Sequence, residues 1–163
     1  GVAPVPHLGA VLEGTATLLS TIPALDPFRA LRGAEQYLGA FPATASPVGG
    51  GEPPAIFASL RRDHPHAPKV LDALAGTKRR AWVYLPDATE SQCVAASSDL
   101  LRVSRQPFSM AAALASRPAV VSYGSHTLGL MALLAGSPQL LLPVNGKDNG
   151  EATEALQPVA ANA

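Results

Sequence analysis

The sequence lacks the residues on which several common classes of protein depend. Only one cysteine, Cys93, stands among 163 residues, which excludes an internal disulfide and argues against a cysteine-based metal site. Lys and Arg together number 12, as do Asp and Glu, and a chain without net charge has no general attraction to nucleic acid or acidic surfaces. We therefore expect a reducing compartment, the cytoplasm, and no nucleic acid among the partners.

Several motifs are absent as well. Gly, Pro, Ser or His interrupts every apolar run before it reaches membrane-spanning length. A secretory signal requires a basic residue near its start, and none precedes Arg29. A P-loop, a Gly-x-Gly-x-x-Gly motif and a Gly-x-Ser-x-Gly elbow are all missing, which argues against an ATPase, a dinucleotide-dependent dehydrogenase and a serine hydrolase. His64 and His66 have no Cys or carboxylate at a metal-ligand spacing, so we expect no metal.

The sequence is rich in glycine and proline, with 14 and 16 residues respectively, and these separate short periodic segments. Apolar, strand-like segments alternate with helical patterns from residue 55 onwards. The expected strands are 55–60, 80–85, 100–103, 119–121 and 139–142, and the expected helices are 68–75, 89–97, 107–116 and 126–135. This order predicts an α/β fold, a Rossmann-like parallel sheet with helices on both faces, in which ligands bind beyond the carboxyl ends of the strands.

The stretch from 118 to 144 is the most informative part of the chain. Ala119–Val121 is a short apolar strand, Ser122–Ser125 is a turn, and a helical pattern begins at His126. The glycine in the turn leaves room for a ligand, and the first N–H groups of the following helix have no partner within it. The turn is therefore suited to an anion such as a phosphate.

Two segments of this stretch, Ser122–His126 and Ala132–Pro143, resemble the donor-site signature of GT-B glycosyltransferases that use nucleotide sugars. In that family the signature runs His-Gly-Gly-x-Gly-Thr, Glu-Ala-Leu, Gly-x-Pro and a hydrophobic strand ending in Pro. Here the spacing from Gly124 to Gly136 and on to the final proline matches without a gap. The resemblance covers roughly 16–143, with specific motifs only in the last third, and implies the C-terminal domain of a GT-B fold.

The departures from the signature fall at five positions. Where the family carries His, Gly, Gly, Thr and Glu, this sequence has Tyr123, Ser125, Thr127, Leu128 and Met131. The resemblance in fold does not depend on these side chains, whereas the binding of a donor does.

We predict that the phosphate-binding residues are Gly124, Ser125, His126, Thr127 and Arg61. For Ser125 and Thr127 the alternative is ordinary helix capping, and for His126 it is an exposed or capping side chain. Arg61 follows the first strand of the domain, and its guanidinium suits bidentate contacts with a diphosphate. The alternative for Arg61 is a solvated pair with the acidic residue two positions later.

The resemblance also implies positions for the base and the sugar. Arg105 and Gln106 follow an expected strand where GT-B enzymes hold the nucleobase and ribose, and Gln106 falls on the Gln of that pattern. Asp148 and Asn149 are the counterparts of an acidic-Gln pair that holds the sugar hydroxyls. Trp82 lies on an expected strand, where packing in the core explains it better than contact with a base.

The domain organisation follows from composition and from the same resemblance. Residues 1–42 are expected to be a remnant of a preceding N-terminal domain, because Tyr37–Pro42 is similar to the end of that domain in GT-B enzymes. Residues 43–54, built of Gly, Pro and Ser, form an expected linker, although a surface loop within one domain is the alternative. Residues 55–144 are the Rossmann-like nucleotide-sugar-binding domain, and 145–163 are an irregular tail or short helix.

The function that the resemblance implies is that of a glycosyltransferase donor-binding domain. It would bind a nucleoside diphosphate sugar, UDP- or dTDP-linked, for transfer to an acceptor hydroxyl, without a further cofactor. An N-terminal acceptor-binding domain or subunit is the implied partner. Two alternatives stay open: a non-catalytic nucleotide-binding or interaction module on the same fold, and another Rossmann-like domain such as that of a sugar epimerase, for which Pro86-Asp87 would supply the acidic end of a strand.

Overall fold

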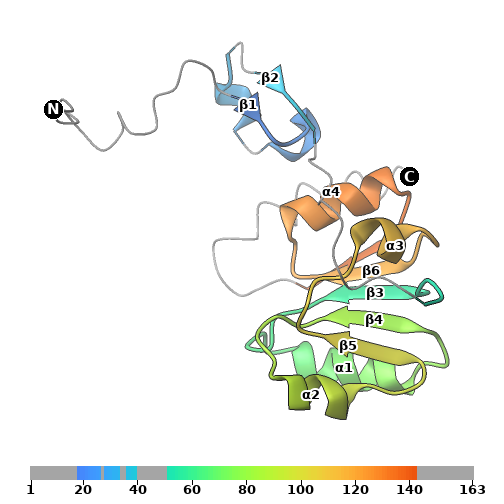
Figure 1. Cartoon of the computed structure of the whole chain (residues 1–163). Helices are drawn as coiled ribbons and strands as arrows, with labels where there is room; N and C mark the ends of the chain where they lie inside the picture. Colours follow the sequence, from blue (N-terminus) through green and yellow to red (C-terminus); the bar gives the residue numbers. More distant parts are fainter. Residues whose placement is uncertain (1–17, 27, 34–35, 40–50, 143–163) are drawn as a thin grey trace, which may run out of the picture.

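The computed structural model describes residues 18–26, 28–33, 36–39 and 51–142. Its main body is a parallel sheet of five strands (Figure 1). In chain order the strands are β3 (Ile56–Ser59), β4 (Ala81–Tyr84), β5 (Leu101–Ser104), β6 (Ala119–Ser122) and β7 (Gln139–Leu141). The helices between them are α1 (Ala67–Gly76), α2 (Glu90–Ala96), α3 (Met110–Leu114) and α4 (His126–Leu134). Each expected strand and helix of this domain is present, and the ends differ from the predicted ones by a few residues.

Helices cover the sheet on both faces because successive strand residues point to opposite sides. In β3, Phe57 packs into one cluster with residues of α3 and α4, whereas Ala58 packs into another with residues of α1 and α2. Val120 and Val121 of β6 divide in the same way. Strands buried on both faces need near-continuous apolar runs, which is the pattern that the sequence shows.

The strand order is β5-β4-β3-β6-β7. The chain therefore runs from β3 outward to one edge, returns to pair β6 against the other side of β3, and ends at β7. The point between β3 and β6, where the direction of winding reverses, is the place where doubly wound sheets bind ligands.

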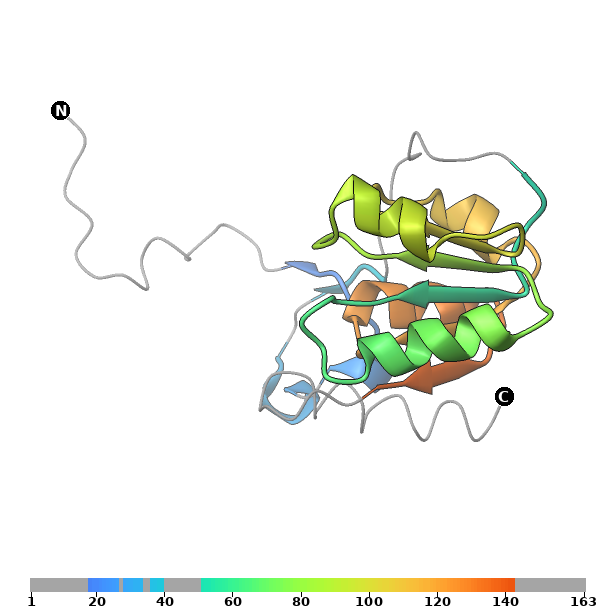
Figure 2. The same ribbon diagram turned by 90° about the horizontal axis from the view of Figure 1, so that it is seen from below.

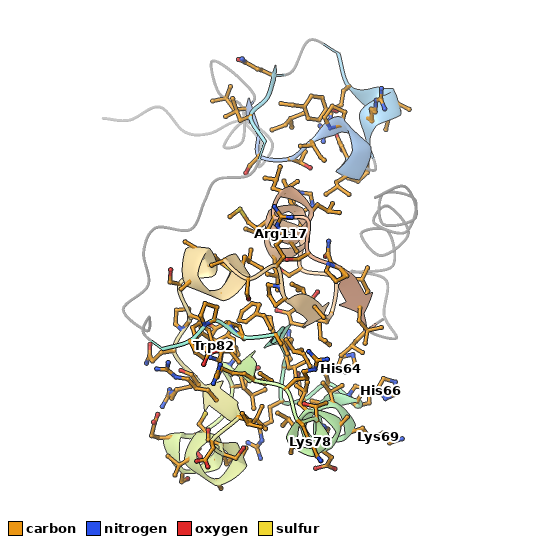
Figure 3. All side chains as sticks on the ribbon, turned by 90° about the vertical axis from the view of Figure 1, so that its right-hand side faces the viewer. His64, His66, Lys69, Lys78, Trp82 and Arg117 are labelled. Atoms are coloured by element: carbon orange, nitrogen blue, oxygen red, sulfur yellow. The ribbon has the colours of Figure 1, made fainter. Side chains whose placement is uncertain are left out.

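Trp82 lies in the core, as predicted. It is 3% exposed on β4 and stacks on Phe108 with ring centroids 5.0 Å apart, and Figure 3 shows it deep among the side chains of the sheet. Phe57 meets the same Phe108 ring edge-on at 6.1 Å. Arg102 covers this aromatic cluster, with its guanidinium 5.7 Å from the Trp82 ring.

Beyond its first turn, helix α4 carries apolar residues around its whole circumference, which suits a helix with two buried sides. Leu128 and Ala132 pack toward the sheet, while Leu130 packs with Leu25 of a small N-terminal unit. Figures 1 and 2 both show that unit beside α4. It contains two short parallel strands, β1 (Leu18–Leu19) and β2 (Gln36–Tyr37), and two 3-10 helices, η2 (Pro23–Leu25) and η3 (Arg29–Leu31).

A hydrogen-bonded carboxylate holds the N-terminal unit together. Asp26 accepts bonds from Arg32 Nε at 2.9 Å, from the Tyr37 hydroxyl at 2.9 Å and from the Phe28 N–H at 2.9 Å. The bond from Arg32 is the largest cause that lowers the pKa of Asp26 from 3.8 to about 2, against the opposing effect of burial. Because two strands of two residues each are marginal alone, this network and the packing on α4 supply most of the order of the unit.

Acid is expected to loosen the N-terminal unit before the sheet. The pKa of Asp26 is lower in the folded unit, so its contribution is complete above pH 3.8 and is lost as the pH falls through about 2. Amide hydrogen exchange between pH 5 and 2 should show early loss of protection at 36–39 in the native chain. Asp26→Asn should show that loss already at neutral pH, and equal protection in the two proteins at pH 6 would contradict the role of this carboxylate.

Helix α4 ends at a glycine, as predicted. Gly136 has φ +67°, and its N–H and that of Ser137 donate to the carbonyls of Leu133 and Ala132 at 3.0 and 2.9 Å. This Schellman arrangement satisfies carbonyls that the helix cannot satisfy itself.

Gly136→Ala is expected to lower the free energy of unfolding by about 1 kcal/mol, because a left-handed backbone is strained for a residue with a Cβ. No atom lies within 4 Å of where that Cβ would be, so backbone strain alone should be measured. Urea unfolding followed by the fluorescence of Trp82 tests this, and an unchanged midpoint would contradict it.

Candidate functional site

The loops after β3 and β6 leave the same edge of the sheet at neighbouring positions. Ser59 of β3 pairs in register with Ser122 of β6, and these are the last residues of their strands. Residues 60–66 and 123–125, which are far apart in the sequence, therefore start side by side at the switch point. All five predicted phosphate-binding residues lie in these two loops or at the start of α4.

Hydrogen bonds of Ser122, the last residue of β6, fix the start of the turn between β6 and α4. Gly124 is buried and has φ +85°, and its N–H donates to Ser122 Oγ at 3.3 Å. Ser122 is fully buried, and its carbonyl accepts the Leu142 N–H at 2.7 Å. The glycine is needed here for its backbone conformation, and the turn fixes where α4 begins.

The N-terminus of α4 has no side-chain cap. Ser125 occupies the N-cap position, but its hydroxyl makes no capping bond, so ordinary capping does not explain this serine. The first helical bond runs from the Gly129 N–H to the Ser125 carbonyl at 2.8 Å. The N–H groups of His126, Thr127 and the next residue have no partner within the helix, and the helix dipole favours an anion beside them.

His126 adds an unsatisfied nitrogen at this helix end. The residue is half-buried, and its Nε2 atom is buried without a hydrogen-bond partner among the described residues. Thr127 is exposed. A buried donor or acceptor without a partner costs about 1–3 kcal/mol, so this nitrogen is a candidate for a hydrogen bond with a ligand.

Arg61 stands across from this turn, in the loop after β3. Its Nη2 and Nε donate to the two carboxylate oxygens of Asp63 at 2.7 and 3.0 Å. These bonds are the main reason that the pKa of Arg61 is raised and that of Asp63 is lowered. Tyr123 and Asp87, in the loops after β6 and β4, add smaller electrostatic effects that raise the pKa of Arg61 further. The solvated pair expected as an alternative is thus present, on two exposed side chains.

His64 lies in the loop after β3 and is buried, whereas its spacing to His66 suggested only a metal ligand, which was not expected. It is 5% exposed, and its Nδ1 accepts the N–H of His66 at 3.2 Å. In the neutral ring the proton is then on Nε2, which is buried and has no partner among the described residues. Figure 3 shows His64 further inside the molecule than His66 and Lys69. Its alternating His-Pro-His sequence gave no signal of this burial.

The structure brings the predicted base-binding residues to the same edge of the sheet but not to the same place. Arg105 and Gln106 follow β5, an edge strand two places from β3, and both are exposed. Ser104 Oγ accepts the Gln106 N–H at 3.0 Å and donates to its carbonyl at 2.9 Å, which fixes the turn. Two strand spacings amount to about 10 Å, so only an extended ligand can contact both loops.

The remaining sequence predictions fall outside the described part or concern absences. Asp148 and Asn149 lie outside the described residues, as does most of the expected linker. Within the described part, no group of three His, Cys, Asp or Glu residues is placed to hold a metal ion. No helix there is long and apolar enough to cross a membrane.

No protein-family model matches the sequence, and no curated protein matches it either. Solved structures do match in fold. The glycotransferase of kitacinnamycin superposes with a TM-score of 0.61 at 12% identity, over 88% of this chain and 40% of that one. The glycosyltransferase VinC, solved with dTDP, gives 0.57 at 16% identity over 93% and 39%. SnogD from Streptomyces nogalater gives 0.53 at 17% identity over 90% and 41%.

These likenesses confirm the predicted fold. The chain has a Rossmann-like α/β fold shared with GT-B glycosyltransferases. It spans about 40% of the length of each of these solved structures. At identities of 12–17% the likeness concerns the fold alone.

Gly124→Ala is expected to destabilise the protein by about 1–2 kcal/mol, because a Cβ disfavours the left-handed backbone of the turn. Gly136→Ala is the matched control, since it places the same strain at the other end of α4. If the turn positions the start of α4, His126 amide and side-chain NMR signals should shift in Gly124→Ala and stay in place in Gly136→Ala. Equal shifts in the two variants would contradict this.

Proposed function

We propose that this chain is the donor-binding part of a GT-B-type glycosyltransferase and that it binds a nucleoside diphosphate sugar at the switch point between β3 and β6. The observation that carries the proposal is the convergence, at this one edge, of Arg61 with the uncapped N-terminus of α4. Both groups attract negative charge, and they come from the two loops where a doubly wound sheet binds its ligand.

The diphosphate would lie against the start of α4. The N–H groups of His126 and Thr127 would donate to its oxygens, Ser125 would offer its free hydroxyl, and Gly124 lets the backbone approach. Arg61 would exchange its bond to Asp63 for a bond to phosphate. This exchange costs little, because an exposed ion pair contributes at most about 1 kcal/mol.

The other parts of the donor would lie along the same edge. Arg105 and Gln106 would contact the nucleobase and ribose, and Asp148 and Asn149 the sugar. No cofactor beyond the nucleotide sugar is needed. UDP and dTDP are the proposed nucleotides, and the presence of dTDP in the VinC structure makes dTDP the first to test.

The proposed reaction transfers the glycosyl group to an acceptor hydroxyl. The bond between the sugar and the diphosphate breaks, and negative charge develops on the leaving diphosphate, where the α4 dipole and Arg61 would stabilise it. The acceptor hydroxyl loses its proton to a base. Since the chain spans about 40% of the solved glycosyltransferases, we assign that base and the acceptor pocket to an N-terminal partner domain or subunit. The cytoplasm stays the proposed compartment, on the evidence of the single, buried Cys93.

A non-catalytic module on the same fold is the second candidate, and one observation favours it. Met131 occupies the position where many GT-B enzymes carry a Glu that helps to hold the donor. In this structure Met131 packs against the apolar cluster of α3 and α4. A contact made by the family's Glu is thus replaced by core packing.

Calorimetric titration of the chain with dTDP and with UDP tests the proposal. Arg61→Ala and His126→Ala should each weaken binding about tenfold, because each removes a charged or buried hydrogen bond worth about 1.5 kcal/mol. Gly136→Ala should bind like the native chain. Two outcomes would contradict the proposed donor site: unchanged binding in both site variants, or no saturation at millimolar nucleotide. The non-catalytic module would then be the better description.

A further inference from the structure

A cavity lies between α1 and α2, on the face of the sheet that these two helices cover. Its volume is about 220 Å³, which is small for a nucleotide sugar, since ligand pockets commonly measure about 300–1,000 Å³. Six of its eight lining residues are aliphatic or proline: Ala67, Pro68, Leu71, Leu85, Ala88 and Ala96. Among the described residues that line it, the other two, Arg62 and Gln92, are the polar ones, and both are exposed. None of the described residues proposed to bind the donor lines this cavity, although Arg62 is the neighbour of Arg61 in the loop after β3.

The orientation of the Gln92 amide is fixed by the helix that carries it. The backbone N–H of Thr89 lies 2.9 Å from Gln92 Oε1, and the Gln92 N–H lies 3.3 Å from Thr89 Oγ1, which together form a capping box. A backbone N–H can only donate, so the atom that meets it must be the oxygen. The NH₂ group of Gln92 takes no part in the capping box, and it can only donate hydrogen bonds.

Arg62, an exposed side chain, also brings only donors to the cavity. Among the described residues it forms no ion pair, whereas its neighbour Arg61 is paired with Asp63. Both polar groups that line the cavity therefore donate hydrogen bonds, and one of them carries a positive charge. An aliphatic cavity with this lining is complementary to an apolar body that ends in an anionic acceptor.

We propose that this cavity binds a small monocarboxylate with an apolar chain. The chain would replace water against the aliphatic residues of α1 and α2. The carboxylate would accept hydrogen bonds from the Arg62 guanidinium and the Gln92 amide. The geometry of the capping box makes Gln92 a selective donor, since its oxygen is already engaged.

Hexanoate is the probe, and its titration into the isotope-labelled chain is followed by NMR. Saturable shifts at Leu71, Leu85 and Gln92 are expected, with a dissociation constant on the order of a millimolar. Hexanol, which has the same chain length without the charge, should bind about tenfold more weakly, because hydrogen bonds to a charged group are the stronger ones.

Single substitutions test how each part of the cavity contributes to hexanoate binding. Arg62→Gln should weaken hexanoate binding about tenfold, whereas Lys69→Gln, which removes a charge from α1 outside the cavity, should leave binding unchanged. Gln92→Glu keeps the capping box and hence the thermal stability, but it places a carboxylate against the ligand and should abolish binding. Ala96→Leu should also abolish binding by filling the cavity.

Two results would overturn the proposal. The first is the absence of saturable hexanoate shifts at the cavity of the native chain. The second is equal affinity for hexanol and hexanoate, together with unchanged hexanoate affinity in Arg62→Gln and Gln92→Glu. That second result would make the cavity an apolar docking groove for a side chain of another protein.

Discussion

The pairing of β3 with β6 is the interaction on which the rest of the structure depends. It joins Ile56–Ser59 to Ala119–Ser122 in parallel register. The sequence between these two strands makes up more than half of the described sheet domain. The pairing makes β3 the central strand and divides the helices between two faces. It also places the loop that carries Arg61 beside the turn that starts α4. Without it the two parts of the proposed donor site would have no fixed relation.

The polar groups at the carboxyl edge differ in how far the fold itself satisfies them. The Gly124 N–H donates to the Ser122 hydroxyl within the turn, and the Ser122 carbonyl accepts the N–H of Leu142 after β7, so these groups hold the fold. Nε2 of His64 and of His126 is buried without a partner among the described residues. Native proteins satisfy nearly all buried polar groups. These two nitrogens, in the loop after β3 and on the first residue of α4, are therefore candidates for hydrogen bonds with a ligand.

The fold of the main domain was predictable because its signals are local. Apolar runs such as Ala119–Val121, and stops such as Gly136, depend only on neighbouring residues, and both are where the sequence predicted them. The site was predictable in part. That Ser125 does not cap α4, and that His64 is buried with a fixed tautomer, depends on rotamers and tertiary packing that no spacing encodes. The small cavity was not foreseen either, because it depends on the gap between α1 and α2.

Helix α4 is packed between the sheet and the N-terminal unit, and this arrangement has a mechanical consequence. If the unit moved away from α4, Leu25 and Leu130, which are 5% and 1% exposed, would face water at a cost of about 1.5–3 kcal/mol each. Separation of the unit from α4 is therefore unfavourable. The packing on α4 thereby couples the N-terminal unit to the helix whose first residues belong to the candidate site.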